Sequence, residues 1–300
     1  MNLSVDIAGV IMKNPITVAS GTFGSGMEYC DFIDLSKLGA VTTKGVASTP
    51  WAGNPTPRIA ETHGGMLNAV GLQNPGIDTF LSRDLPFLLE QNAKIIVNVC
   101  GKTVEDYLAV CEKLKGTDVD LLEINVSCPN VKEGGIAFGQ DPKALFEITK
   151  AVKEVAAQPV IMKLSPNVTS IAEMAKAAEA GGADAVSLIN TITGMKIDVE
   201  KRTFQLANRT GGLSGPAIHP VAVRMVYEVH KATSLPIIGM GGVATTEDAL
   251  ELIMAGATMV AVGTANFTNP YATLDIIDGI ERYLQNHHIE DVKELIGCVE

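Results

Sequence analysis

Eight short apolar runs alternate along the chain with longer segments of helical periodicity, and this alternation constrains the fold most strongly. Each run is rich in Val and Ile and is bounded by Gly, Pro or Asn, which is typical of buried strands in a parallel sheet. Eight strands with intervening helices in about 250 residues predict a (β/α)8 TIM barrel, with a doubly wound open sheet as the alternative. The expected strands lie near 16–20, 40–45, 94–99, 120–127, 159–165, 185–190, 236–242 and 259–265.

The intervening segments have the apolar period of amphipathic helices, and several begin with Thr, Ser or Asp at the N-cap position. We therefore expect a single α/β domain spanning residues 1–300. The expected helices lie at 103–115, 141–156, 170–183, 219–232 and 245–257.

Two connections, about 46–93 and 191–217, are longer than an ordinary βα loop, which has roughly 2 to 6 residues. Both follow the carboxyl end of an expected strand, where barrels build their active sites. We interpret them as long insertions at that face that form the walls or lid of a site. Decorated surface loops are the alternative.

Composition excludes several classes of protein. A net charge of -11 argues against non-specific nucleic-acid binding, which needs clustered Lys and Arg. No run approaches the roughly 18 uncharged apolar residues of a membrane span, and no secretion signal is recognisable at the start. The cysteines have no CxxC spacing and indicate reduced thiols of a cytoplasmic protein. They are Cys30, Cys100, Cys111, Cys128 and Cys298.

Polar residues stand at or just beyond the ends of six expected strands. Converging on one rim, they would form a basin of amide groups with two cations, suited to an anionic ligand or a polarised carbonyl. Lys163 is also a candidate Schiff-base lysine, and either lysine could simply pair with an acid. The six residues are Ser20, Lys44, Asn98, Asn125, Lys163 and Asn190.

The last two expected strands end in glycine-rich segments, GMGGV at 239–243 and VGTAN at 262–266. Glycines let backbone N–H groups approach a phosphate, which barrels commonly bind after strands seven and eight. Gly215 could close the same site. Neither a G-x-G-x-x-G nor a Walker motif is present, so a mononucleotide fits better than directly bound NAD.

Cys128 lies in the loop NVSCPNVKEGGIAFGQDP, residues 125–142, directly after the fourth expected strand. Most cysteines are small buried hydrophobes, and we interpret the other four in that way. Polar neighbours distinguish Cys128, which could act as a nucleophile or proton acceptor.

Motifs along nearly the whole chain resemble the class 1 dihydroorotate dehydrogenases, and most closely the catalytic subunit of class 1B. The resemblance implies an FMN-containing barrel that oxidises (S)-dihydroorotate to orotate in pyrimidine synthesis. It rests on ASGTFG, TTKGV, NAVGLQNPG, VNVCG, NVSCPNVKEGG, IMKLSPN, LINT, GGLSGPA, GMGGV and VGTA.

By this resemblance Cys128 would be the base that takes the C5 proton of the substrate while hydride passes from C6 to flavin N5. By the same resemblance Lys163 would stabilise reduced flavin, and this role replaces the Schiff-base role. The expected substrate contacts are Lys44, Asn68, Ala69, Val70, Gly71, Leu72, Asn125, Asn130, Asn190 and Thr191. The expected FMN contacts are Ser20, Lys44, Gly45, Asn98, Asn125, Lys163 and Ile189, with Gly215, Gly241, Gly242, Gly263 and Thr264 at the phosphate.

The resemblance also implies a partner. Class 1B enzymes pair this subunit with an electron-transfer subunit that carries FAD and a [2Fe-2S] cluster and passes electrons to NAD, so we expect a homodimer assembled with two such subunits. A class 1A homodimer that reduces fumarate is one alternative. A Schiff-base lyase using Lys163 and a non-catalytic phosphate-binding barrel are two others.

Overall fold

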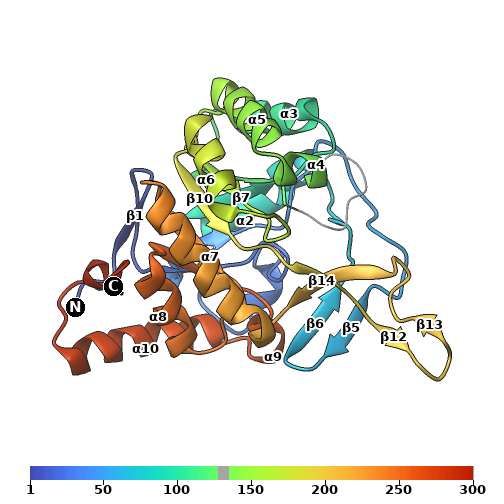
Figure 1. The fold of residues 1–300 in the computed structure, drawn as a ribbon. Helices are drawn as coiled ribbons and strands as arrows, with labels where there is room; N and C mark the ends of the chain where they lie inside the picture. The colour runs from blue at the N-terminus through green and yellow to red at the C-terminus, as the bar shows by residue number, and fades with distance from the viewer. Residues whose placement is uncertain (128–134, 300) are drawn as a thin grey trace.

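The computed structural model describes residues 1–127 and 135–299, and its centre is an eight-stranded parallel sheet surrounded by helices (Figure 1). All eight expected strands are present, so the predicted (β/α)8 barrel is confirmed. The spatial order of the sheet is β3-β16-β15-β10-β9-β8-β7-β4. The strands are β3 (Ile16–Val18), β4 (Val41–Thr42), β7 (Ile95–Val99), β8 (Leu121–Asn125), β9 (Val160–Lys163), β10 (Ala185–Leu188), β15 (Ile237–Met240) and β16 (Met259–Val262).

The two terminal strands of this order, β3 and β4, meet and close the barrel. The N–H of Gly39 donates to the carbonyl of Ile16 at 2.9 Å, and the hydroxyls of Thr17 and Thr42 lie 3.0 Å apart inside the barrel. Both threonine side chains are buried. Polar residues therefore occupy part of the barrel interior, where aliphatic side chains are the usual filling.

The helices cover the outside of the barrel with one apolar face each. In α7 the buried residues Ala222, Met225, Val226 and Val229 follow the i, i+3, i+4, i+7 spacing of a helix packed on a sheet. All five expected helices are present. The helices are α1 (Ile77–Thr79), α2 (Leu85–Glu90), α3 (Val104–Leu114), α4 (Gly135–Gln140), α5 (Pro142–Val155), α6 (Ile171–Ala180), α7 (His219–Ala232), α8 (Thr246–Ala255), α9 (Ala265–Thr268) and α10 (Ala272–His287), with a π-helical segment at Phe80–Asp84 and 3-10 turns at Met27–Tyr29, Leu35–Lys37, Pro216–Ile218 and Val292–Leu295.

The start of α3 carries a capping box between Thr103 and Asp106. Burial alone would raise the pKa of Asp106, but the backbone N–H groups of Lys102 and Thr103 and the hydroxyl of Ser48 donate to its carboxylate and lower that pKa. The ionised form is thus the one that the folded protein stabilises.

The two long connections contain a second sheet that the sequence did not predict. Its order is β11-β14-β6-β5, and all neighbouring strands are antiparallel. Each of the two connections supplies two of the four strands. Figure 1 shows β5, β6 and β14 beside the barrel, with a hairpin of β12 and β13 beyond them. The strands are β5 (Ile59–Thr62), β6 (Gly65–Asn68), β11 (Ile192–Met195), β12 (Ile197–Asp198), β13 (Thr203–Phe204) and β14 (Thr210–Ser214).

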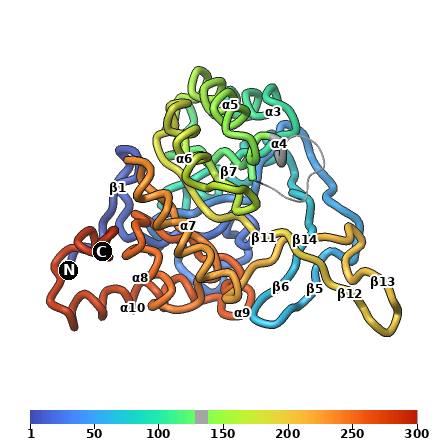
Figure 2. The backbone as a smooth tube through the Cα atoms, viewed as in Figure 1, coloured from blue at the N-terminus to red at the C-terminus, as the bar shows by residue number. Residues whose placement is uncertain are grey.

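The two ends of the chain lie side by side (Figure 2). The N–H of Asn2 donates to Glu290 O at 2.7 Å, and the N–H of Val292 donates back to Asn2 O at 3.0 Å. A hairpin of β1 (Val5–Ile7) and β2 (Val10–Met12) follows and buries Ile7 and Met12 in the core. Within the described ranges no helix has the length and apolarity needed to cross a bilayer.

Candidate active site

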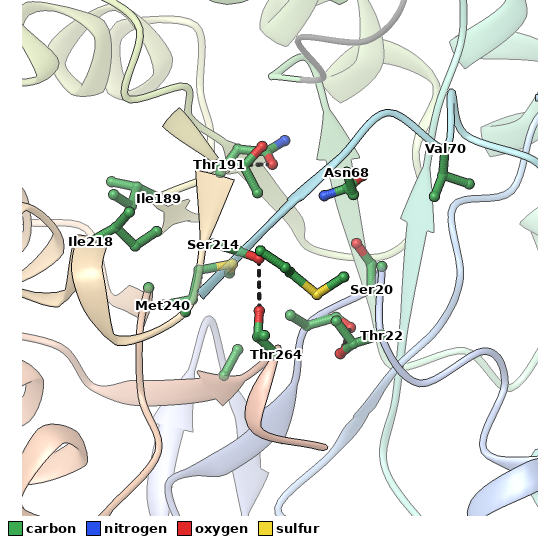
Figure 3. Close-up of a pocket in the computed structure, with 18 of the residues that line it drawn as sticks. Ser20, Thr22, Asn68, Val70, Ile189, Thr191, Ser214, Ile218, Met240 and Thr264 are labelled. Carbon is green, nitrogen blue, oxygen red and sulfur yellow. Dashed lines mark hydrogen bonds between the residues drawn. The ribbon is translucent and has the colours of Figure 1, made fainter. Parts of the chain in front are cut away.

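A cavity opens at the carboxyl ends of the barrel strands (Figure 3). Residues that end or follow β3, β8, β9 and β10 line its inner side, while β5, β6 and β14 of the second sheet contribute its outer wall. Parallel strands bring their carboxyl ends to one edge, so residues far apart in the sequence converge there. The two long connections thus form walls of the site, as one of the two interpretations of them predicts.

Lys163, the last residue of β9, lies at the inner end of this cavity. Its Nζ donates to Ser20 Oγ at 3.4 Å and lies 3.8 Å from Oε1 of Glu123. Both charged side chains are almost completely buried, at 6% and 2% exposure. An ion pair therefore accounts for Lys163 without Schiff-base chemistry, and it places one positive charge against the cavity wall.

Glu123 also contacts Asn98 of the neighbouring strand β7, and Asn98 in turn contacts Asn125 at the end of β8. Asn98 Nδ2 donates to Glu123 Oε1 at 2.5 Å, and Asn125 Nδ2 donates to Asn98 Oδ1 at 3.2 Å. Asn98 is fully buried and does not reach the cavity, whereas Asn125 lines it. The hydroxyl of Tyr107 donates to Asn125 O at 2.9 Å and holds the end of β8 in place.

A second pair of polar contacts crosses from β8 to β10. Asn190 Nδ2 donates to both the Oγ and the carbonyl of Ser127, at 2.9 and 3.1 Å. Asn190 Oδ1 accepts the N–H of Thr191 at 2.7 Å. Asn190 and Thr191 line the cavity, and Asn68 at the end of β6 faces it from the second sheet (Figure 3). The cavity wall is therefore rich in amide groups with fixed partners.

Four glycines, which we call the glycine cluster, line the other end of the cavity. They come from three loops, after β14, β15 and β16: Gly215, Gly241, Gly242 and Gly263. Gly242 has φ +72°, and a Cβ there would lie 2.8 Å from the carbonyl oxygen of Gly215. Only glycine allows this close approach of two loops. Thr264 Oγ1 donates to Ser214 Oγ at 2.8 Å beside the cluster (Figure 3).

His219 supports the glycine cluster from the first residue of α7. Its Nδ1–H donates to the carbonyl of Gly241 at 2.8 Å, and its Nε2 lies 3.0 Å from Oε2 of Glu251. The imidazole is buried behind the cluster. With one carbonyl held from behind, the peptide plane that links Gly241 to the next residue has a fixed orientation.

The structure brings most of the predicted site residues to the cavity. Gly45, Ala69 and Asn98 lie behind its wall, and Cys128 and Asn130 fall outside the described residues. The predicted residues that line it are Ser20, Lys44, Asn68, Val70, Gly71, Leu72, Asn125, Lys163, Ile189, Asn190, Thr191, Gly215, Gly241, Gly242, Gly263 and Thr264. Their individual roles stay predictions.

Sequence reasoning missed residues that support this wall from behind. Glu123 stands inside the apolar run LLEIN, and a charged residue within a buried strand was a usable signal, because lone charges are rarely buried. His219 gave no such signal at the start of an ordinary helix. The cavity also has apolar lining that was not predicted, from Ile59, Met66, Ile218, Met240, Ala261 and Phe267.

The described cysteines differ from what a base requires. Burial raises the pKa of Cys111 to about 12, and burial together with Asp31 and Asp34 raises the pKa of Cys30. The expectation that these four cysteines are buried is confirmed for Cys100 and Cys111 and is wrong for Cys30 and Cys298, which lie exposed on the surface. Across residues 1–127 and 135–299, no three or more His, Cys, Asp and Glu side chains come together in a group that could hold a metal ion.

Comparison with known proteins identifies the family of this chain. The sequence profile of the family described as Dihydroorotate dehydrogenase matches residues 2–284. A protein of Lachnoclostridium phytofermentans is 67% identical over 300 residues, covering 100% of both chains, and one of Alkaliphilus metalliredigens is 63% identical over 299 residues, covering 100% of this chain and 99% of the other. Both are named "Dihydroorotate dehydrogenase B (NAD(+)), catalytic subunit". The chain therefore belongs to the dihydroorotate dehydrogenase family.

Proposed function

We propose that this chain oxidises (S)-dihydroorotate to orotate with FMN in the cavity, as the catalytic subunit of an NAD-linked enzyme of pyrimidine synthesis. The observation that carries the proposal is the combination of amide groups, Lys163 and the glycine cluster in one cavity of a chain from this family. Its relatives' name supports the reaction and the NAD linkage.

The donor set fits FMN. A phosphate needs closely spaced backbone N–H groups or cations, and the glycine cluster removes the side chains that would block access to its backbone. A Cβ at Gly263 would meet only Ala19 Cβ at 3.4 Å and Thr22 Cγ2 at 4.0 Å, so space for a ligand lies beside this glycine. Ser20 and Lys163 at the other end would hold the polar edge of the isoalloxazine ring.

When bound, the flavin supplies an acceptor for the hydride that leaves C6 of the substrate. The chain's own residues bind and orient the substrate. Lys44 and the amides of Asn68, Asn125 and Asn190 supply one positive charge and several hydrogen-bonding groups for a carboxylate and an imide. We assign removal of the C5 proton to Cys128, on the resemblance of NVSCPN to the family motif.

Lys163 has an electrostatic role in this scheme. Its ammonium lies against the cavity wall with Glu123 as counter-ion, so its charge is only partly available to a ligand. A cation beside the ring favours negative charge on the reduced flavin. The pair would thus tune how strongly the site stabilises that charge.

We further propose that the chain acts in the cytoplasm as a homodimer, assembled with two electron-transfer subunits that carry FAD and a [2Fe-2S] cluster. The words "catalytic subunit" in the relatives' name support a partner. A fumarate-reducing homodimer is the alternative. Co-expression with the candidate partner distinguishes them: a complex that reduces NAD supports the proposal, and a lone homodimer that reduces fumarate contradicts it.

Colour tests the central proposal. The purified chain is expected to be yellow, and its flavin absorbance is expected to bleach when dihydroorotate is added without oxygen. A protein that stays colourless after incubation with FMN would refute it. Borohydride trapping of a substrate on Lys163, with loss of activity, would instead support the lyase.

A further inference from the structure

We propose that Glu123 is a positioning residue that sets the orientation of the amide side chains facing the substrate. Glu123 lies inside the barrel on β8, is 1% exposed and does not line the cavity. Its carboxylate, paired with Lys163, accepts hydrogen bonds and donates none. The inference rests on the proposed function for the identity of the ligand, and on the hydrogen-bond pattern for everything else.

An acceptor-only group at the start of a chain of amides favours one orientation of each later amide, and backbone groups of Ser127 and Thr191 favour the same orientation of Asn125 and Asn190. Asn98 must direct its Nδ2 at Glu123, at 2.5 Å, which leaves its Oδ1 toward Asn125. Asn125 must then direct its own Nδ2 at Asn98, at 3.2 Å. Turning either amide over would place two oxygens, or two N–H groups, against each other.

The same direction continues to the cavity rim. Asn125 Oδ1 accepts the N–H and the hydroxyl of Ser127, at 3.3 and 3.1 Å. Because the Ser127 hydroxyl donates to Asn125, its oxygen is available to accept Nδ2 of Asn190, at 2.9 Å. Asn190 Oδ1 in turn accepts the N–H of Thr191. Every donor in this asparagine chain points back toward Glu123.

The consequence for a ligand is a fixed pattern of donors and acceptors. Asn125 has two N–H bonds on Nδ2, and among the described residues Asn98 accepts one of them, which leaves the second for a ligand. Asn190 uses Nδ2 on Ser127 and retains one lone pair on Oδ1. The wall therefore suits a planar ligand with a carbonyl or carboxylate oxygen toward Asn125, as in orotate.

The test moves the acceptor-only group along the chain. Glu123→Met removes it, while the double variant Glu123→Gln/Asn98→Asp transfers it to position 98, where the carboxylate accepts from both neighbours and Asn125 keeps its native orientation. Glu123→Gln alone removes the charge and keeps an acceptor. Ser187→Ala is the matched control, because Ser187 is buried in β10, two strands from β8, and its Oγ has no hydrogen-bond partner among the described residues.

The measurement is the dissociation constant of orotate, followed by the change in flavin absorbance of each purified, FMN-loaded protein. We expect binding at least about tenfold weaker for Glu123→Met, since Asn98 can turn over once its Nδ2 loses its acceptor, and orotate binding must then restore the native orientation of Asn125. Glu123→Gln, the double variant and Ser187→Ala are expected to stay within about threefold of the native protein. A merely structural role of Glu123 would change melting temperature and FMN content without this pattern.

Three results would overturn the inference. One is native orotate affinity in FMN-loaded Glu123→Met, and another is equal weakening in Glu123→Gln and Glu123→Met, which would make charge alone responsible. The third result is a double variant that fails to fold or to bind orotate, and this variant decides the question if Glu123→Met does not fold. Absence of orotate binding by the native protein would refute the proposed function itself, whereas a wrong pattern among the variants with native binding intact refutes only the role of Glu123.

Discussion

Gly263→Ala separates the stability of the barrel from the binding of FMN. The backbone of Gly263 lies outside the left-handed region, and a Cβ there would make ordinary contacts of 3.4 Å with Ala19 and 4.0 Å with Thr22. Replacing glycine by alanine at a compatible position stabilises a protein by about 0.4–1 kcal/mol, because the unfolded chain loses freedom. The apo-protein should therefore be as stable as the native protein or slightly more stable.

The same methyl group faces two residues that line the cavity, so it occupies space beside the glycine cluster. If the FMN phosphate binds there in the native protein, the variant loses one hydrogen bond to the charged phosphate, which is worth about 1.5–3 kcal/mol. This corresponds to roughly 10- to 150-fold weaker FMN binding. The flavin dissociation constant, from the fluorescence of free FMN, and the melting temperature of the apo-protein measure the two effects separately.

Gly116→Ala is the matched control with the opposite pattern. Gly116 has φ +71° and no atom within 4 Å of a Cβ, so alanine there strains the backbone by about 1 kcal/mol and fills no cavity. This variant should lose stability and keep native FMN affinity. Native FMN affinity in Gly263→Ala would refute the placement of the phosphate. A large loss of stability in the apo-protein of this variant would refute the statement that a Cβ fits beside Gly263.

Three further predictions follow from individual side chains. Cys128→Ala should abolish steady-state turnover while FMN stays bound, and undiminished turnover would refute the assignment of the base. Asp106→Ala should lower the free energy of unfolding by about 1–2 kcal/mol near pH 7. Because folding lowers the pKa of Asp106, this loss of stability should shrink as the pH falls below about 4. Urea titrations that show the same loss at every pH would contradict this prediction. An alkylating reagent at neutral pH should label Cys298 in the native protein but Cys111 only after unfolding, because Cys111 is buried and burial raises its pKa to about 12. Mass spectrometry of the digested protein measures the labelling, and labelling of Cys111 before unfolding would contradict this prediction.

The sequence by itself determined the barrel and most of the cavity wall. Strand and helix periods are local properties, so eight strands and five long helices could be located from short windows of residues. Parallel strands place their carboxyl ends together, so polar residues such as Asn125 and Lys163 at those ends had to meet. The glycines after β15 and β16 lie at the same edge, so they had to line the same cavity.

Only the tertiary structure decided which partners lie behind that wall. The second sheet pairs Gly212 with Asn68, two residues 144 positions apart, and no local pattern encodes such a pairing. Glu123 likewise finds Lys163 and Asn98 because neighbouring strands have a particular register, Asn98 opposite Glu123 and Asn125 opposite Lys163. Residue types could show that amides line the cavity. The direction in which each amide is turned depends on hydrogen bonds between strands, which exist only once the barrel has closed.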